Sequence, residues 1–305
     1  MIVLITGGAG FIGSHLVEHF QGKAEVRVLD NLRSGSLRNL ANFQYRFFEG
    51  SILDRKLVRQ AVSGADYVFH LAAMISVPES MQRMTECVEL NTQGTLVVLE
   101  EAARAGVKKL CFSSSAAIYG NNPVTPKVET MFPEPRSPYA VTKLDGEYYC
   151  NLYTEESLLQ TACMRYFNVF GPRQDPKSQY AAAIPGFISR ALKGEPLTIF
   201  GDGGQTRDFV YVKDIVAANA FLATESPATG VFNVGCGEIT TILDLAKSIV
   251  EAAGGRSEIK FAPERAGDVR HSCADISKLL ATGFRPKTSL REGLPTTIQA
   301  FATSA

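Results

Sequence analysis

The sequence predicts an α/β fold, with a doubly wound parallel sheet and a smaller, interleaved C-terminal domain. Over the first half of the chain, short apolar runs alternate with helical patterns, which is typical of parallel strands buried on both faces. A glycine-rich turn, residues 7–13, separates the first expected strand from the first expected helix. Beyond residue 165 the loops become rich in Gly, Pro and Gln, which indicates a second domain.

The expected strands are the short apolar runs 2–6, 26–30, 45–49, 67–71, 110–113 and 161–165. The expected helices are residues 14–21, 54–62, 84–105 and 138–156. Most of these helices carry apolar residues three and four positions apart, as in Leu16, Val17 and Phe20. A late apolar run, 231–234, resembles the earlier strands, so we expect it to rejoin the sheet.

Composition narrows the class of protein. The chain has 305 residues, of which 45% are hydrophobic and 20% charged, which argues against disordered and fibrous proteins. A formal net charge of zero gives no reason to expect nucleic acid or an anionic membrane as a partner. No apolar run approaches the roughly 20 residues of a membrane-spanning helix. The N-terminus reads as a strand rather than a targeting segment, so we expect a cytoplasmic protein.

Cysteine and histidine spacing gives no sign of a metal site. The six cysteines form no C-x-x-C pair, and most stand among apolar residues, so we expect reduced thiols. His15 and His19 are four residues apart, but no acidic or thiol partner completes a site. We therefore expect no metal.

The turn at residues 7–13 has the pattern G-x-x-G-x-x-G. Glycine lets the backbone approach a pyrophosphate, and the following helix N-terminus offers unpaired N–H groups to the anion. Asp30 ends the second expected strand, where a carboxylate accepts from a ribose 2′-hydroxyl and disfavours the 2′-phosphate of NADP. Arg33 favours a 2′-phosphate, but we treat it as secondary to Asp30. The pattern predicts a Rossmann-type site for NAD.

Domain boundaries follow from this site. We expect residues 1–167 to form the NAD-binding Rossmann domain, with residues 206–234 rejoining it. Residues 168–205 and 235–305 are expected to form the second domain.

A catalytic arrangement is expected where a strand ending in three serines, residues 113–115, meets the helix that begins near Tyr139. Tyr139 and Lys143 are four residues apart, which places both on one helix face, where an ammonium lowers the pKa of the phenol. A serine hydroxyl from the neighbouring strand can share the hydrogen bond to a reacting carbonyl or alcohol. We predict Ser115, Tyr139 and Lys143 as catalytic residues.

With these motifs in place, the chain resembles the extended short-chain dehydrogenase/reductases, and within them the UDP-hexose 4-epimerases, over essentially its whole length. The resemblance rests on residues 6–13, 30–32, 70–73, 91, 113–120, 139–143, 165–168, 206–208 and 267–268. Residues 173–176 and 267–272 resemble the UDP-N-acetylglucosamine 4-epimerases most closely.

The resemblance implies tightly held NAD. Ser51 departs from the family, whose members often carry Asp there to hold the adenine amino group. The implied cofactor residues are Gly7, Gly10, Phe11, Ile12 and Gly13 under the pyrophosphate; Asp30, Asn31, Ser34, Gly35, Ser51 and Ile52 around the adenosine half; and Leu71, Ala72, Ala73, Asn91, Ser113, Tyr139, Lys143 and Tyr166 toward the nicotinamide half.

The resemblance also implies a UDP-sugar site in the second domain, where arginine forks suit a diphosphate. A small residue at one position admits a 2-N-acetyl group, and counting four from Asp268 places Ser272 there. If the count shifts forward by one residue, the position falls on Cys273, which is also small, and the interpretation holds. If it shifts back by one, the position falls on His271, which is bulky, and the interpretation is reversed. The implied substrate residues are Ser76, Ser114, Ser115, Tyr139, Asn168, Thr198, Phe200, Arg207, Arg265, Asp268 and Ser272.

The implied activity is a UDP-sugar 4-epimerase, an isomerase that interconverts UDP-GlcNAc with UDP-GalNAc and UDP-Glc with UDP-Gal. Tyr139 takes the 4-hydroxyl proton while a hydride passes to NAD, and the 4-keto sugar turns over before the hydride returns. The alternatives are a UDP-glucuronate 4-epimerase and a catalytically silent NAD-binding scaffold. A dehydratase is disfavoured because Ala116 and Ala117 stand where an acidic pair is needed. A homodimer is expected through helices 84–105 and 138–156.

Overall fold

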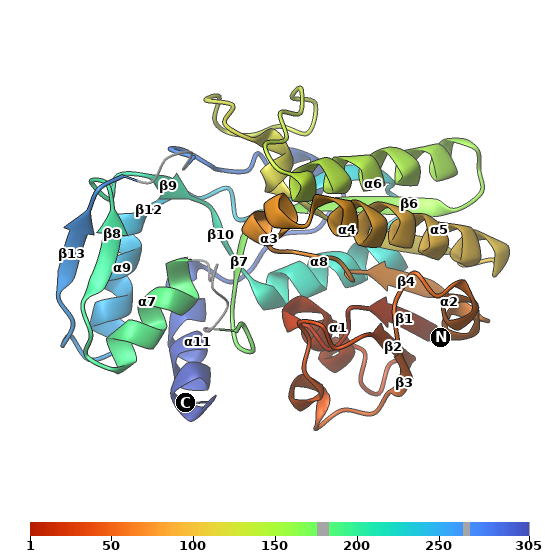
Figure 1. Ribbon diagram of the computed structural model, residues 1–305, viewed down its shortest axis with the longest axis horizontal. Helices are drawn as coiled ribbons and strands as arrows, with labels where there is room; N and C mark the ends of the chain where they lie inside the picture. The colour runs from red at the N-terminus through yellow and green to blue at the C-terminus, as the bar shows by residue number, and fades with distance from the viewer. Residues whose placement is uncertain (176–182, 265–268, 305) are drawn as a thin grey trace.

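The central sheet has seven strands, all parallel, in the order β11-β6-β5-β4-β1-β2-β3. The computed structural model (Figure 1) describes residues 1–175, 183–264 and 269–304. The chain winds outward in both directions from β1, which confirms the predicted fold class. The strands are β1 (Ile2–Thr6), β2 (Glu25–Asp30), β3 (Arg46–Glu49), β4 (Tyr67–His70), β5 (Lys109–Ser115), β6 (Gln160–Tyr166) and β11 (Gly230–Val234).

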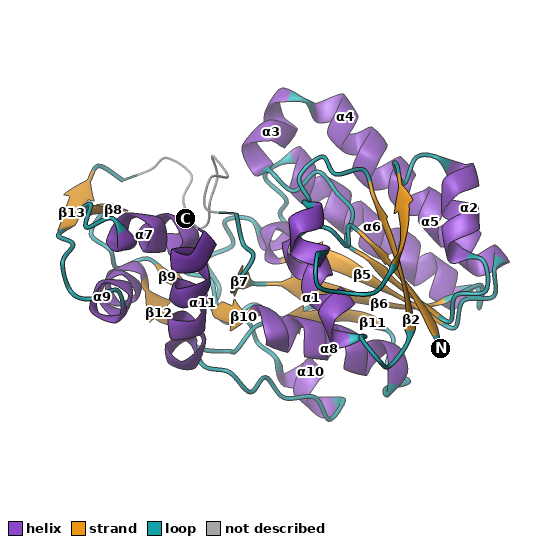
Figure 2. Ribbon diagram, turned by 90° about the horizontal axis from the view of Figure 1, so that it is seen from below, coloured by secondary structure: helices purple, strands orange, loops and turns teal. Residues whose placement is uncertain are grey.

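Helices cover both faces of this sheet (Figure 2). On one face, α1 (Phe11–His19) and α8 (Val212–Thr224) share a core that includes Leu16 and Ile215. The other face carries α2 (Arg55–Val62), α5 (Gly94–Arg104) and α6 (Pro138–Glu155), with α3 (Val77–Gln82) and α4 (Met84–Val88) at its end. Two cores thus sandwich the sheet, as a doubly wound fold requires.

The expected helix 84–105 is interrupted. A π-helical turn, Glu89–Gln93, separates α4 from α5 and contains the buried residues Leu90 and Asn91. Such turns often occur at functional sites because they redirect a side chain. Here the redirected side chain is Asn91, which reaches the loop after β4.

A smaller lobe lies beside the sheet (Figure 1, left). The strands β8 (Leu197–Phe200) and β13 (Ile259–Ala262) pair in parallel, and α7 (Ala183–Leu192), α9 (Ile242–Ala252) and α11 (Leu290–Ser304) pack with them. The chain passes between the lobes through two short sheets, formed by β7 (Asn168–Phe170) with β10 (Phe209–Tyr211) and by β9 (Thr206–Arg207) with β12 (Thr240–Thr241). The short α10 (Ser277–Ala281) packs against β11.

Asp208 holds these crossings together. Its buried carboxylate accepts hydrogen bonds from the backbone N–H groups of Cys236 (2.8 Å), Gly237 (2.9 Å) and Ala274 (3.1 Å). Strand β11 therefore leaves the sheet directly into a segment that is anchored to the smaller lobe. Within the described residues, no helix has the length and apolar character needed to cross a membrane.

Candidate active site

The glycine turn packs tightly between β1 and α1. Gly7 has a positive φ of 71°, and a Cβ there would lie 2.8 Å from the backbone nitrogen of Ala72. Helix α1 starts at Phe11 with Gly10 as its N-cap, and its first turn has neither a side-chain cap nor an acidic residue. The N–H groups of that turn therefore remain available to an anion, as a dinucleotide pyrophosphate requires.

Asp30 organises the end of β2 beside this turn. Its carboxylate accepts hydrogen bonds from the N–H groups of Ala9 (2.9 Å) and Leu32 (2.8 Å). Burial raises the Asp30 pKa, and the two hydrogen bonds oppose that rise. The loop that contains Asn31, Ser34 and Gly35 then folds over Ala9, where a Cβ on Gly35 would lie 2.9 Å from the Ala9 backbone carbon. These residues therefore lie together at the end of β2.

Arg33 is held by carboxylates on the other side of the glycine turn. Its guanidinium donates to Glu79 of α3 at 2.7 Å and pairs with Glu86 of α4. Arg33 follows β2 and both glutamates follow β4, and β2 and β4 are the two neighbours of β1. The ion pairs therefore bridge the carboxyl end of β1. Because the charge of Arg33 is engaged there, it does not compete with Asp30 for the choice of cofactor.

The loop after β4 is fixed by hydrogen bonds from both sides. Leu71 and Ala72 donate from their backbone N–H groups to the Thr6 hydroxyl at 3.2 and 3.3 Å, and Ala73 follows in the same loop. Asn91 accepts from Met74 N at 2.7 Å and donates to Met74 O at 3.1 Å. The buried Asn91 amide is thus hydrogen-bonded inside the protein and fixes the loop after β4, and its predicted contact with the cofactor stays a prediction.

The adenine side is partly corrected. The Ser51 hydroxyl accepts from Leu53 N at 3.2 Å in a turn after β3. Ile52 is 2% exposed, and its side chain packs on α5, where a Cβ on Gly94 would lie 2.5 Å from Ile52 Cδ1. The Ile52 side chain is therefore part of the core, so the predicted contact of this residue with the cofactor falls to its backbone.

The three predicted catalytic residues meet at the end of β5. Ser137 caps α6 through a hydrogen bond from Ala140 N to its hydroxyl (3.2 Å), which sets the first turn that carries Tyr139. The Ser115 side chain lies close enough to the Tyr139 hydroxyl to lower the pKa of the phenol. Lys143, one turn later, lies 5.9 Å from the centre of the Tyr139 ring. Strand β5 and helix α6 thus present hydroxyl, phenol and ammonium together.

Charge at this site differs from expectation. Burial raises the pKa of Tyr139, and the hydrogen bond from Ser115 opposes that rise. Burial lowers the pKa of Lys143 to about 8. The net pKa of Tyr139 is therefore raised and not lowered as expected, because burial is the largest cause. The Lys143 ammonium donates to the Ser113 carbonyl at 2.6 Å.

Tyr166 extends the site along β6. Its hydroxyl lies 3.0 and 2.7 Å from the two amide atoms of Asn219 in α8, and it is also hydrogen-bonded to the Ser113 side chain. Ser113 and Tyr166 therefore lie next to each other. Asn219 was missed because it lies in an apolar helix far along the chain, with no motif around it.

Ser114 is a second correction. Its side chain is 2% exposed and donates to Glu147 of α6 at 2.5 Å. Successive residues of a strand point to opposite faces, so Ser113 and Ser115 share one face and Ser114 takes the other. The alternation of a strand was the signal that separates them, and a sugar contact for Ser114 is wrong.

The predicted substrate residues of the smaller lobe fall into two groups. Asn168 donates to the Asp208 carbonyl (3.0 Å), and Arg207 donates to the Thr206 carbonyl (2.8 Å), where the lobes meet. Ser272 is bonded through its N–H to the same Thr206 carbonyl (3.2 Å). These three residues therefore lie on neighbouring segments.

The remaining predicted residues lie apart or are not described. Thr198 and Phe200 share the less buried face of β8, farther into the smaller lobe. Ser76 caps α3 by accepting from Glu79 N at 3.2 Å. Arg265 and Asp268 lie outside the described residues. No group of three or more His, Cys, Asp or Glu side chains suited to a metal occurs in the part of the chain that the structure describes.

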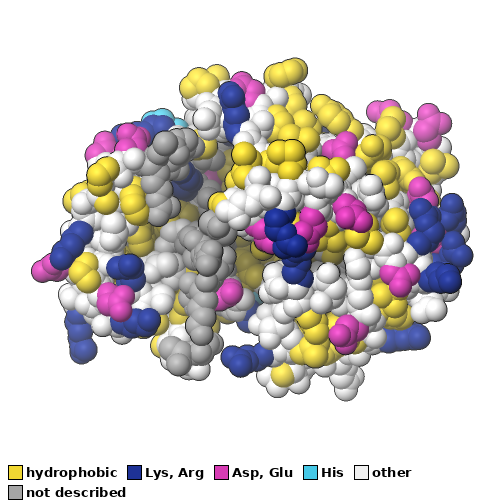
Figure 3. All heavy atoms as spheres, viewed as in Figure 1, with side chains coloured by type: hydrophobic (Ala, Val, Ile, Leu, Met, Phe, Trp, Pro, Cys, Tyr) yellow, Lys and Arg dark blue, Asp and Glu magenta, His cyan; other side chains and the backbone are white. Residues whose placement is uncertain are grey.

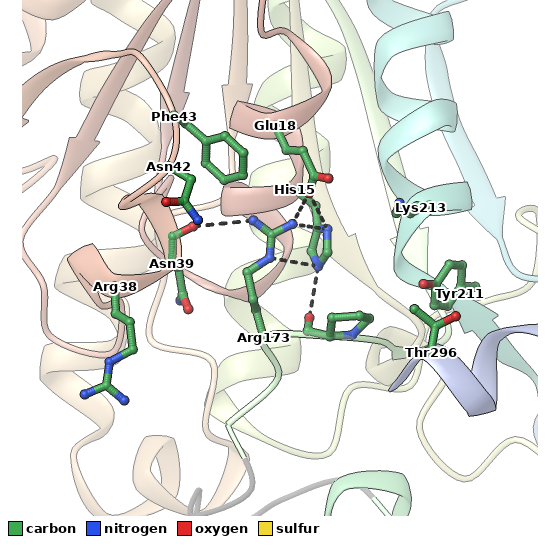
Figure 4. Close-up of a pocket in the computed structure, with 11 residues that line it drawn as sticks. His15, Glu18, Arg38, Asn39, Asn42, Phe43, Arg173, Tyr211, Lys213 and Thr296 are labelled. Atoms are coloured by element: carbon green, nitrogen blue, oxygen red, sulfur yellow. Dashed lines mark hydrogen bonds and ion pairs between the residues drawn. The ribbon is translucent and has the colours of Figure 1, made fainter. Parts of the chain in front are cut away.

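A separate pocket of about 340 Å³ lies on the other side of α1 (Figure 4). Arg173 projects into it from the loop after β7 and pairs with Glu18 and His15 (Figure 4). None of the predicted cofactor or substrate residues lines this pocket. This pocket is lined by residues of both lobes and is separate from the site described above.

Comparisons with known proteins agree with this geometry. The model of the NAD dependent epimerase/dehydratase family matches residues 3–235. A UDP-glucose 4-epimerase of Mycolicibacterium smegmatis is 38% identical over 311 residues, covering 99% of this chain and 98% of the relative.

Two solved structures are also similar. The UDP-glucose 4-epimerase of Thermotoga maritima with UDP-glucose has a TM-score of 0.94 and 43% identity, covering 100% of this chain and 99% of that one. The UDP-N-acetylglucosamine 4-epimerase of Methanobrevibacter ruminantium M1, in complex with UDP-N-acetylmuramic acid, has a TM-score of 0.95 and 40% identity, covering 99% and 98%.

Proposed function

The chain belongs to the NAD dependent epimerase/dehydratase family, and we propose that it is an isomerase, a UDP-sugar 4-epimerase that keeps NAD bound. The observation that carries the proposal is the meeting of Ser115, Tyr139 and Lys143 beside the carboxyl edge of the sheet. A scaffold that only binds NAD needs none of these three groups. An epimerase needs all of them, because a proton must leave and return at the same oxygen.

The residues around β1 fit NAD. The open first turn of α1 suits the pyrophosphate and Asp30 suits the ribose, while Lys143 and Tyr166 would hold the nicotinamide half. When bound, NAD supplies a hydride acceptor, which later returns the hydride, and a positive charge.

The proton is handled by the protein. Tyr139 takes it from the sugar 4-hydroxyl and gives it back, while Ser115 shares the hydrogen bond to the same oxygen. Lys143, with a pKa of about 8, is mostly an ammonium at neutral pH and stabilises negative charge on the phenol oxygen. A hydride returned to the opposite face of the sugar would invert one centre without net oxidation.

The smaller lobe, which we assign to residues 168–205 and 235–305, would hold the UDP. Asn168 and Arg207 lie where the lobes meet, and the planar fork of Arg207 suits a diphosphate. If the substrate is held through its diphosphate, the sugar ring is free to turn either face toward the cofactor.

For the sugar we propose both UDP-GlcNAc/UDP-GalNAc and UDP-Glc/UDP-Gal. The support is Ser272, a small, partly exposed side chain bonded through its backbone beside Arg207. Cys273, the alternative in the count, is equally small but 4% exposed. His271, the bulky alternative in the count, is exposed, and its ring is bonded to the Thr206 hydroxyl at 3.0 Å.

Proton NMR of the purified protein with UDP-GlcNAc and no added NAD tests this proposal. Approach to a mixture with UDP-GalNAc would support epimerisation, retained cofactor and an open pocket together. Conversion of UDP-Glc alone would refute the proposal that the sugar pocket admits a 2-N-acetyl group. Conversion of UDP-glucuronate alone would move the function to uronate epimerisation. Silence with all three sugars, in protein shown to contain NAD, would favour a scaffold.

We also propose a homodimer through the outer face of α4 and α6. Exposed apolar side chains follow both helices, and hydrophobic side chains gather over this region in Figure 3. Thr92, in the π-helical turn that follows α4, donates to Asp145 of α6 at 2.8 Å and so links this turn to α6. A second copy would pair these helices into a four-helix bundle. The exposed residues are Met84 (53%), Val88 (40%), Val141 (49%), Tyr148 (55%) and Leu152 (52%).

A further inference from the structure

A charged pair lies buried directly behind the catalytic residues. Glu147 of α6 and Arg165 of β6 have side chains that are 2% and 5% exposed. Arg165 forms a bidentate contact with the carboxylate of Glu147, donating from Nε to Oε1 at 2.9 Å and from Nη2 to Oε2 at 2.7 Å. We propose that this pair is a positioning device for Ser115 and Lys143. The proposal rests on the proposed epimerase function.

The pair holds the chain on both sides of Ser115. On one side, Ser114 donates its hydroxyl to Glu147 Oε1 at 2.5 Å. On the other side, Arg165 donates from Nη1 to the hydroxyl of Tyr119 at 2.9 Å. Tyr119 ends the short 3₁₀ helix Ala116–Tyr119, which is capped by Ser115 itself. The backbone that carries Ser115 is therefore fixed before and after the residue.

The same network reaches a third strand. The Tyr119 hydroxyl donates to Asn233 of β11 at 2.6 Å. Strands β5, β6 and β11 are adjacent, with Ser114 opposite Arg165 and Arg165 opposite Asn233. One buried chain of hydrogen bonds thus crosses three strands at the edge of the sheet where the reaction takes place. Displacing any member would shift Ser115 relative to Tyr139.

Glu147 is also linked to Lys143 through their common helix. Tyr139, Lys143 and Glu147 follow at intervals of four residues, so they lie along one face of α6. The negative charge of Glu147 raises the Lys143 pKa and so opposes the lowering that burial causes. Glu147 therefore helps to keep the Lys143 ammonium charged near neutral pH.

A second buried carboxylate, Glu101, forms ion pairs that are far from the catalytic residues. Glu101 of α5 is 2% exposed and receives Arg55, Arg59 and Arg104 at 2.7 to 3.0 Å. It fastens α2 to α5 and contacts none of the catalytic residues. Glu101 is thus a matched control, because its loss costs buried ion pairs without touching the site.

The test compares Glu147→Gln with Glu101→Gln in the NAD-loaded enzyme. Both variants should lower the melting temperature. Only Glu147→Gln should lower kcat, by about ten- to a hundredfold with KM little changed, because small displacements of reacting groups are costly. Only Glu147→Gln should move the alkaline limb of the pH–rate profile down, by about half a pH unit, because the Lys143 ammonium loses a neighbouring anion.

Ser114→Ala gives a milder test should Glu147→Gln fold poorly. It removes one hydroxyl and keeps the charge of Glu147, so kcat should fall several-fold while the alkaline limb stays in place. Wild-type kcat and pH profile in both variants, with melting temperatures lowered as in Glu101→Gln, would overturn the proposal.

The pKa of Lys143, read by NMR titration of labelled lysine side chains, does not depend on turnover. If the wild-type protein converts no UDP-sugar, the proposed function fails. A lower Lys143 pKa in Glu147→Gln, but not in Glu101→Gln, would still support the link between Glu147 and Lys143. An unchanged Lys143 pKa would overturn that link.

Discussion

Lys143 donates a 2.6 Å hydrogen bond from its ammonium to the carbonyl oxygen of Ser113. This bond ties α6, which carries Tyr139, to β5, which carries Ser115. The position of the phenol relative to the serine is therefore set by a contact between helix and strand and not by either element alone. The predictions below follow from this arrangement and from the groups around it.

Removal of the Tyr139 hydroxyl should stop epimerisation. Tyr139→Phe keeps the ring but loses the group that moves the proton, so turnover should fall by about a hundredfold or more. NAD should stay bound, because the glycine turn and Asp30 are untouched. Turnover by NMR and NAD content by chromatography check both points. Tyr148→Phe, on the exposed face of the same helix, is the control and should behave as wild type. Full activity in Tyr139→Phe would exclude the proposed mechanism.

The rate should decline at alkaline pH. Lys143 has a pKa of about 8, so its ammonium is present below that pH and is lost above it. We expect kcat to fall as the pH rises from about 7.5 to 9.5. Lys143→Arg, in so far as it turns over, should lack this decline because arginine stays charged. A flat wild-type profile over this range would show that the charge of Lys143 does not limit the reaction.

Arg33 should slow the release of NAD, because its pairs with Glu79 and Glu86 cross the carboxyl end of β1. Arg83 pairs with the same two glutamates, but it lies between α3 and α4 on the same side of β1, so its ion pairs do not cross the end of that strand. Arg33→Ala should release NAD about two- to fivefold faster, which is the size expected for partly exposed ion pairs. Arg83→Ala should release NAD at the wild-type rate. Equal release rates from the two variants would refute the bridge.

His70 should make the protein sensitive to acid. It is buried between the hydroxyls of Thr6 (2.7 Å) and Thr95 (2.9 Å), and burial lowers its pKa from 6.5 to about 3. The native state therefore binds this proton less well than the unfolded chain. The contribution of neutral His70 to the stability of the native state is fully present above pH 6.5 and is lost as the pH falls toward 3. The loss is on the order of 4 kcal/mol at pH 3.

Urea denaturation between pH 7 and 4 checks this prediction. His70→Gln should lose less stability on acidification than wild type, although it starts lower because a hydrogen bond is disturbed. The same acid loss in His70→Gln as in wild type would assign it to other groups.

A charge on the outer face of α6 should separate the proposed dimer. Val141→Glu and Leu152→Glu place carboxylates on side chains that are 49% and 52% exposed and lie along the same face. Light scattering should report one chain, 33.1 kDa, in place of two. Phe132→Glu changes an 82% exposed residue outside these helices and should leave the mass unchanged. A wild-type protein with the mass of one chain would contradict the dimer.

Local sequence patterns were a good guide to the framework. The expected strand 2–6 is the observed β1, and the expected helix 138–156 differs from α6 by one residue. These elements are recognised because their apolar spacing and their caps lie within a few residues. The π-helical turn Glu89–Gln93 was missed because it changes the hydrogen-bond spacing of a helix without changing its apolar pattern.

The site was anticipated where function depends on a local motif and missed where it depends on long-range partners. Tyr139 and Lys143 were found by their spacing on one helix. Ser114 was assigned wrongly because its partner, Glu147, is 33 residues away. Asn219, 53 residues from Tyr166, carries no local signal at all.

The sequence by itself determined the order of strands and helices, the glycine turn, Asp30 and the spacing of Tyr139 and Lys143. These features depend on backbone preferences and side-chain periodicity over short stretches. Only the tertiary structure decided which serines face the reaction, which carboxylate lies behind Lys143, and how burial moves the pKa of each group. Hydrogen-bond partners and desolvation arise when distant segments pack together, so no local pattern contains them.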